Sequence, residues 1–218
     1  MKRQDKKNEH LKQQLKDLHK KFDELKLDSW EKVEAHDKYM ADVYIELAKK
    51  IRPLKLPNQN NIAVLGSVSV GKSTIVNSLL DKKLADVGAG ETTTRTSVYK
   101  GNGLQIFDVY GKNDEKTYMT PESICDLKSV EKRLLVITST VKDITKLARF
   151  LDQLNLRYTI VFNKFDLVDD EEQQQLRQKI ENEVKVLELK CCEKIYFISG
   201  KHPEKFDDWN KLVKHLRQ

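Results

Sequence analysis

Cysteine, proline, glycine and long apolar runs are all scarce in this chain of 218 residues. Three cysteines cannot build a disulfide framework, and Cys125, Cys191 and Cys192 lack the spacing of zinc ligands. The 8 Gly and 4 Pro exclude a collagen-like or Pro/Gly-rich disordered chain. No apolar run approaches the roughly 20 residues of a membrane-spanning helix, and the charged N-terminus leads to no signal peptide. These absences predict a cytoplasmic protein with reduced thiols.

The positive charge is modest and lies mainly in the first quarter of the chain. The net charge is +6, and residues 1–60 carry 15 Lys and Arg against 11 Asp and Glu. Lys alternates there with Asp and Glu rather than with aromatic residues, which is typical of a solvated helical surface and not of a nucleic-acid interface. We therefore expect no nucleic-acid partner, and at most a weak peripheral contact with an intracellular membrane.

A helical extension is predicted over residues 1–56, because residues 1–52 contain no glycine and the first proline is Pro53. Its first helix has apolar residues spaced by four and three, which places on one face Leu11, Leu15, Leu18, Phe22 and Leu25. A second helix is predicted to start at the capping-box spacing of Asp28 and Glu31. Its buried face is predicted to contain Trp30, Val33, Met40, Tyr44, Leu47 and Ile51. The extension either packs on its own globular domain, or associates with a second copy or a membrane.

Residues 57–218 differ from the extension in their hydrophobic pattern, because short apolar runs alternate there with amphipathic segments. Strands are predicted at 62–65, 97–100, 104–107, 133–138, 158–162 and 195–199. Helices are predicted at 72–80, 143–154, 169–189 and 206–216. This alternation predicts an α/β domain with a mainly parallel sheet and helices on both of its faces.

A glycine-rich segment between the first of these strands and its helix matches the phosphate-binding pattern G-x-x-x-x-G-K-[ST]. The predicted nucleotide-binding residues of this segment are Gly66, Ser67, Val68, Ser69, Val70, Gly71, Lys72, Ser73 and Thr74. The glycines let successive backbone N–H groups point at a phosphate, and the helix dipole adds to their attraction. Lys72 is predicted to neutralise the β- and γ-phosphates, and the Ser73 hydroxyl is predicted to ligate Mg²⁺.

A second pattern, N-K-x-D, follows the strand predicted at 158–162. The carboxylate of Asp166 can accept hydrogen bonds from guanine N1–H and from its exocyclic amine, whereas adenine has an acceptor at N1 and lacks that amine. Lys164 is predicted to cover a face of the base, and Asn163 to hold neighbouring loops together. After the last strand, backbone N–H groups of Ser199 and Gly200 are predicted to meet guanine O6. The nucleotide is therefore predicted to be GTP or GDP.

Two segments between these patterns are predicted to complete the magnesium and γ-phosphate contacts. Asp108 follows a predicted strand and is placed to hold Mg²⁺, mostly through water, while the N–H of Gly111 can reach a γ-phosphate. A threonine hydroxyl in the preceding loop could fill the metal shell, with Thr94 as the first choice and Thr93 as the second. The predicted metal ligands are therefore Ser73, Thr94 and Asp108.

In this order, the segments resemble the translation-factor-like class of GTPases, which implies a P-loop GTPase domain. The phosphate loop 66–74 and the helix segment 77–80 are similar to the dynamin superfamily and its immunity-related (interferon-inducible) relatives. The stretch 133–140 and the end of the chain, 196–212, resemble the immunity-related branch more closely. The resemblance covers about residues 45–218, and it implies a homodimer or oligomer in the GTP state.

The motifs also depart from these families. Tyr110 occupies the position of a usual proline, and neither Val68 nor Lys112 can orient the attacking water as a glutamine does in relatives. We therefore expect slow turnover by a single molecule, with a missing group supplied by a partner or a second copy.

Two functions remain open for this set of residues. The first is an enzyme that hydrolyses GTP to GDP and phosphate with Mg²⁺, with Lys72, Ser73 and Thr94 as its catalytic residues. The second is a nucleotide-dependent binding module or switch with negligible hydrolysis of its own.

Overall fold

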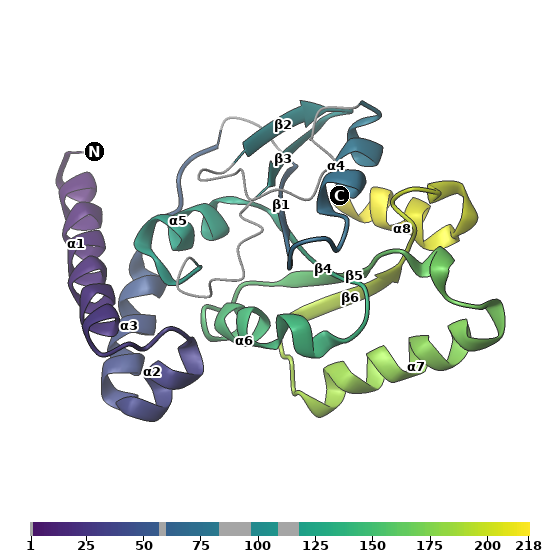
Figure 1. The fold of residues 1–218 in the computed structure, drawn as a ribbon. Coiled ribbons are helices and arrows are strands. Elements are labelled where there is room, and N and C mark those ends of the chain that lie inside the picture. The colour runs from purple at the N-terminus through teal and green to yellow at the C-terminus, as the bar shows by residue number, and fades with distance from the viewer. Residues whose placement is uncertain (1, 57–59, 83–96, 109–117) are drawn as a thin grey trace.

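A six-stranded sheet forms the centre of the molecule, as the computed structural model shows for residues 2–56, 60–82, 97–108 and 118–218 (Figure 1). The strand order is β2-β3-β1-β4-β5-β6. The strands are β1 (Asn61–Leu65), β2 (Ser97–Gly101), β3 (Leu104–Asp108), β4 (Lys132–Ile137), β5 (Tyr158–Phe162) and β6 (Cys192–Phe197). All neighbouring strands are parallel except β2, which pairs antiparallel with β3 at one edge. The predicted mainly parallel sheet is confirmed.

Helices cover both faces of this sheet, also as predicted (Figure 1). One face packs against α4 (Lys72–Leu80) and α8 (Asp207–Leu216), and the other against α6 (Thr145–Gln153) and α7 (Asp170–Val186). β1 and β4 are fully buried apart from the first residue of β4, because both of their faces are covered. Short 3-10 turns, η2 (Val141–Ile144), η3 (Phe165–Leu167) and η4 (Pro203–Lys205), join some of these elements.

The observed elements differ from the predicted ones mainly at their ends. β6 starts three residues earlier than predicted and ends at Phe197, and α6 is preceded by η2 instead of forming one helix with it. The sequence prediction missed α5 (Pro121–Ser129) altogether. Its signal was present, since Thr120 accepts a hydrogen bond from Ser123 N and Pro121 occupies the first turn.

The extension consists of three helices rather than the predicted two: α1 (Lys2–Glu24), α2 (Trp30–His36) and α3 (Lys38–Lys50). The break lies at Asp37, which is extended and accepts a hydrogen bond from Met40 N as the N-cap of α3. The N-cap of α2 is Ser29, not Asp28, and the Asp28 carboxylate pairs with Lys32 instead. Leu25 is 47% exposed, contrary to the predicted stripe, because α1 has already ended.

The extension packs on the globular part of the chain through an apolar core of its own. Residues from α1, α2 and α3 meet side chains of α5 and α6. The Trp30 ring lies tilted against the Phe150 ring, with 5.7 Å between their centroids. The partners contributed by the α5 and α6 regions are Met119, Ile124, Cys125, Phe150 and Leu154. Of the two interpretations of the extension, the structure therefore has the first, in which it packs on its own domain.

Polar contacts reinforce this junction at α5. Lys128 Nζ donates hydrogen bonds to the carbonyls of Ala48 (2.9 Å), Lys49 (2.7 Å) and Ile51, which end α3. Burial lowers the pKa of Lys128, because desolvation disfavours its ammonium form. The buried Tyr44 hydroxyl donates to the carbonyl of Met119. The charged end of Lys128 thus satisfies carbonyls at the C-terminal end of α3 that lie 77 to 80 residues away in sequence.

Replacing Lys128 with methionine is expected to lower the free energy of unfolding by roughly 2 kcal/mol, because the last carbonyls of α3 lose a charged donor. Lys49→Met is the matched control, since Lys49 lies on α3 itself and pairs only across 3.6 Å with Glu46. That control is expected to change stability by no more than about 0.5 kcal/mol. Urea unfolding at neutral pH measures both, and equal losses in the two variants would contradict the capping role.

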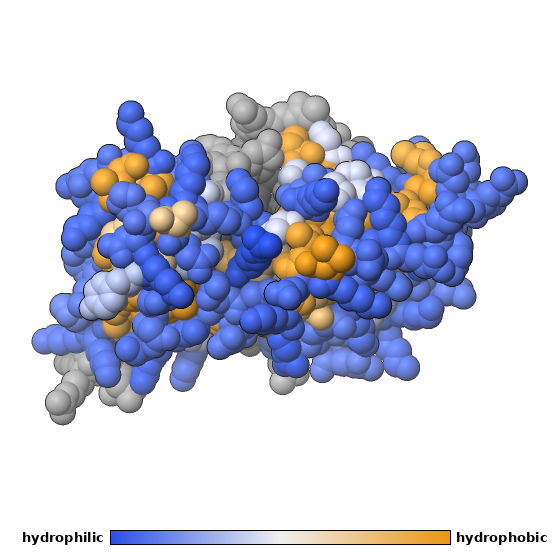
Figure 2. Space-filling model, turned by 90° about the horizontal axis from the view of Figure 1, so that it is seen from below, coloured by the Kyte–Doolittle hydropathy of each residue, from blue (hydrophilic) through white to orange (hydrophobic). Residues whose placement is uncertain are grey.

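The surface is mostly hydrophilic, and on the face seen in Figure 2 apolar residues lie in separate groups. Large apolar side chains that are exposed are Leu25, Tyr39, Leu54, Val68, Val98, Leu167 and Val186. Isolated apolar side chains of this kind are normal on protein surfaces. Within the described residues, no helix combines the length and apolar character needed to cross a membrane.

Candidate functional site

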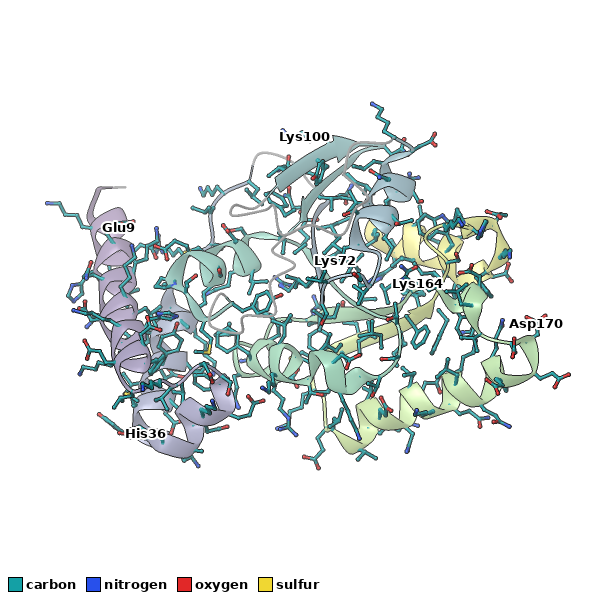
Figure 3. The ribbon with its side chains drawn as sticks, viewed as in Figure 1. Glu9, His36, Lys72, Lys100, Lys164 and Asp170 are labelled. Atoms are coloured by element: carbon teal, nitrogen blue, oxygen red, sulfur yellow. The ribbon has the colours of Figure 1, made fainter. Side chains whose placement is uncertain are left out.

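The predicted nucleotide-binding segments gather at one edge of the sheet. The phosphate loop follows β1, the N-K-x-D segment follows β5, and Ser199 and Gly200 follow β6. These three strands run parallel within one sheet, so the segments that follow their carboxyl ends lie along the same edge. Figure 3 shows Lys72 and Lys164, from two of these segments, near each other below α4.

The phosphate loop has the backbone that its glycines predict. Gly66 and Gly71 have φ values of +145° and +90°, which only glycine adopts readily. A Cβ atom would lie 2.5 Å from the Val136 carbonyl oxygen at Gly66, and 2.3 Å from Asn163 Nδ2 at Gly71. Any side chain at either position would therefore both strain the backbone and push against a neighbouring segment.

The side chain of Lys72 is buried within the phosphate loop. Only 8% of the residue is exposed, and Nζ donates hydrogen bonds to the carbonyls of Gly66 (2.9 Å) and Ser67 (2.8 Å). Lys72 also begins α4, whose N-cap is Gly71, a residue with no side chain to accept from the N–H groups of the first turn. A buried ammonium beside an uncapped helix N-terminus suits a phosphate group.

Asn163 joins the phosphate loop to the segment that follows β6. Its side chain is 2% exposed, and Nδ2 donates to the Val70 carbonyl at 2.8 Å. Its Oδ1 accepts a hydrogen bond from Gly200 N, also at 2.8 Å. Both polar atoms of the Asn163 amide therefore form hydrogen bonds with the protein, as the predicted role in holding neighbouring loops requires.

Lys164 and Asp166 lie on either side of the buried Phe165. Lys164 has a left-handed backbone, with φ of +59°, and its exposed side chain reaches the phosphate loop, where Nζ donates to the Ser69 carbonyl at 2.8 Å. Asp166 is half-buried within η3. The long stem of Lys164 thus extends from the N-K-x-D segment to the phosphate loop, and its predicted role is to cover a face of the base.

The Gly200 backbone differs from its predicted role. Its N–H donates to Asn163 rather than pointing towards a base, and its carbonyl accepts a hydrogen bond from Ser78 Oγ at 2.6 Å. Ser199 is 1% exposed, and its hydroxyl accepts from His202 N at 3.0 Å. Ser78 is a supporting residue that was not predicted from the sequence; its position on α4, opposite the Gly200 carbonyl, is decided by the tertiary structure.

The predicted magnesium ligands are only partly described. Ser73 is half-buried in the first turn of α4, beside Lys72. Thr93, Thr94, Tyr110, Gly111 and Lys112 lie outside the described residues, as does the side chain of Asp108, whose backbone ends β3 next to β1. Among the described residues, no group of three or more His, Cys, Asp or Glu could hold a metal ion. The Ser73 hydroxyl is a hard oxygen donor beside the phosphate loop, and so fits Mg²⁺ held jointly with phosphate oxygens.

Comparison with known proteins agrees with this geometry. The model of a family described as 50S ribosome-binding GTPase matches residues 61–164. Over these residues the chain has the fold of a P-loop GTPase domain. Relatives include GTPase Era of Fusobacterium nucleatum, 30% identical over 64% of this chain and 50% of Era, and GTPase Der of Buchnera aphidicola, 31% identical over 69% of this chain and 36% of Der. The chain thus spans half or less of the length of these relatives.

Solved structures show the same fold for the P-loop GTPase domain. Era in complex with MgGDPNP and 16S ribosomal RNA superposes with a TM-score of 0.50, at 23% identity over 72% of this chain and 55% of Era. Elongation factor SelB of Methanococcus maripaludis gives 0.51, at 16% identity over 76% of this chain and 34% of SelB. The predicted P-loop GTPase fold is confirmed. The relatives are named GTPases and the Era complex contains MgGDPNP, which agrees with the predicted enzyme class and ligands.

One prediction needs correction at this point. The expected absence of a nucleic-acid partner is contradicted by the Era structure, which contains nucleotides 1506–1542 of 16S ribosomal RNA. Charge patterning weighs only the residues of this chain, so it gave no sign of the RNA that the Era structure contains. These relatives, Era and Der, show the coarser GTPase type, and the finer resemblance to dynamin-related and immunity-related GTPases stays a prediction.

Proposed function

We propose that this chain binds GTP and GDP with Mg²⁺ and hydrolyses GTP slowly to GDP and phosphate. The observation that carries the proposal is the set of hydrogen bonds made by Asn163. Asn163 belongs to the guanine-reading segment, residues 163–166, and it bonds both to Val70 of the phosphate loop and to Gly200 after β6. This link holds the two recognition motifs at a set separation, as one nucleotide spanning them requires. The homology of residues 61–164 to GTPases of known class supports the same activity.

The residues of this chain would act by position and charge. In the bound state we expect Lys72 Nζ to leave the carbonyls of Gly66 and Ser67 for the β- and γ-phosphates, where it offsets charge that develops on the bridging oxygen. The N–H groups of the loop and of the first turn of α4 would orient the phosphates. Mg²⁺, when bound to Ser73 and the phosphates, supplies further neutralisation of charge.

Turnover is expected to be slow, because Val68 carries no group that can position water. Its side chain has no polar atom and the residue is 50% exposed, at the place in the phosphate loop where the dynamin resemblance predicts a glutamine. Unassisted domains of this class turn over at about 10⁻⁴ to 10⁻² s⁻¹, and a group supplied from outside adds roughly 10³- to 10⁵-fold.

We also propose that the missing group comes from a second copy of the chain. The similarity of segments 66–74 and 133–140 to self-assembling GTPases supports this finer assignment. GTP turnover per molecule is then expected to rise with protein concentration over a hundredfold range, measured as phosphate release with Mg²⁺ in excess. The control is the same series with Lys72→Ala, and a fast rate that is independent of concentration would contradict the proposal.

The alternative, a nucleotide-dependent binding module, predicts a flat and low rate in the same series. The partner of such a module would then set the rate, and the Era complex makes RNA one class of partner to add to the assay. A rate that rises with added RNA and not with protein concentration would favour the module. The cytoplasmic location, with or without a peripheral membrane contact, stays a prediction.

A further inference from the structure

An arginine on α7 lies directly behind the guanine-reading segment. The guanidinium carbon of Arg177 is 4.8 Å from the ring centroid of Phe165 and 4.5 Å from that of Phe197. Guanidinium groups at such distances are attracted to aromatic faces. Arg177 is partly exposed, with 31% of its side chain accessible, so it closes the outer side of the ring cluster.

Phe165 is the central member of this cluster and the one residue between Lys164 and Asp166. It is fully buried, and its ring centroid lies 5.1 Å from Phe197, 5.3 Å from Phe206 and 5.8 Å from Phe162. Phe165 and Asp166 are neighbours in one short turn, η3, so the backbone that places the Phe165 ring also places the first atoms of the Asp166 side chain.

Asp208 of α8 holds Arg177 in this place. Its Oδ2 accepts from Arg177 Nη1 at 2.9 Å and from Phe197 N at 3.2 Å, and its Oδ1 from Lys211 Nζ at 3.1 Å. Burial by itself would raise the pKa of Asp208, but the hydrogen bonds from Arg177, Phe197 and Lys211 hold it below its usual value. The carboxylate therefore stays charged and bridges α7, α8 and β6.

We propose that Arg177, anchored by Asp208, is a positioning residue for guanine recognition. Its planar guanidinium packs against the Phe165 ring and thereby keeps the Asp166 carboxylate oriented so that it can accept from both N1–H and the exocyclic amine of the base. The proposal rests on the guanine specificity of the proposed function. Arg177 contacts the Phe165 ring, so in this proposal it acts on the nucleotide only through Asp166.

The test compares GDP with inosine diphosphate, whose base keeps N1–H but lacks the exocyclic amine. Wild-type protein is expected to bind GDP roughly 10- to 100-fold more tightly, because one hydrogen bond to a charged acceptor is lost with inosine. In Arg177→Ala this ratio is expected to fall by roughly five- to tenfold, because small displacements of an aligned group are costly. Fluorescence titration of both ligands on one preparation cancels any inactive fraction, and thermal unfolding checks folding.

Lys211→Met is the matched control, because Lys211 pairs with the same carboxylate but the ring contacts belong to Arg177. Its GDP-to-inosine ratio is expected to equal that of the wild type. Arg177→Lys, which keeps the charge but not the plane, is expected to lower the ratio as well. Wild-type behaviour of Arg177→Lys, or a ratio lowered equally in Lys211→Met, would overturn the role of the stacked plane.

The outcomes also separate this inference from the function on which it rests. Equal weakening of both ligands in Arg177→Ala, with the ratio unchanged, would mean that Arg177 merely stabilises the fold. A wild-type protein that binds both ligands equally would instead contradict guanine recognition by Asp166 itself. A wild-type preference for GDP that persists in Arg177→Ala would leave the proposed function intact and refute only the positioning role.

Discussion

Lys72→Ala is expected to weaken the binding of GTP and GDP by roughly 30- to 3,000-fold, the range seen when one partner of a buried charge pair is removed. The side chain is 8% exposed and enclosed by carbonyls of its own loop. A phosphate that arrives there without the ammonium meets those carbonyl oxygens and loses its main counter-charge. Isothermal titration with Mg²⁺ and GDP measures the effect.

Lys82→Ala is the control for this variant, because it removes the same charge from an exposed residue just beyond the C-terminal end of α4. Its affinity for GDP is expected to stay within about twofold of the wild type, since a solvated charge at that distance is screened by salt. Tight GDP binding by Lys72→Ala would contradict the phosphate-loop assignment. An equal loss of GDP affinity in Lys72→Ala and Lys82→Ala would mean that the effect comes from net charge and not from the position of Lys72.

Asp166→Asn is expected to erode the preference for guanine over adenine nucleotides. A site built on a carboxylate that accepts from guanine can reject adenine by roughly 10⁴-fold. The amide keeps only one acceptor oxygen for guanine, which weakens guanine binding. Its NH₂ group can donate to adenine N1, which strengthens adenine binding, so both changes lower the preference. We expect the ratio of ADP to GDP dissociation constants to drop by roughly 100-fold or more, and competition titrations measure it.

Asp170→Asn serves as the control, because Asp170 is an exposed carboxylate at the start of α7 (Figure 3). It removes the same charge four residues away, and its preference for GDP is expected to match that of the wild type. Wild-type protein that binds ADP as tightly as GDP would show that the segment 163–166 does not read guanine.

The sequence by itself determined those features that depend on neighbouring residues. The phosphate loop is one example, since Gly66 and Gly71 have the positive φ angles that the pattern implies. The fully buried strands β1 and β5 are another example, because mainly apolar runs of this kind are typical of strands that are covered on both faces of a sheet. Both signals lie within a stretch of a few residues, so local propensity is enough to predict them.

Local patterns failed where a single residue outweighed its surroundings. The helical stripe of residues 30–51 continues through Asp37, yet Asp37 ends one helix and caps the next with its own side chain. The stripe of α1 likewise includes Leu25, which is exposed because the helix stops before it. Periodicity describes which face a helix would bury and not where the helix ends.

Only the tertiary structure decided how the motifs are joined. The Asn163 side chain meets Val70, 93 residues away in sequence, and Gly200, 37 residues away. Lys128 caps α3 from α5, and Arg177 reaches Phe165 and Asp208 from a third helix. Such contacts depend on how the sheet and helices stack, because hydrogen bonds and ring contacts act over only a few ångströms while their partners lie far apart in the chain. The sequence thus determined which groups can bind a nucleotide, and packing decided which groups hold them in place.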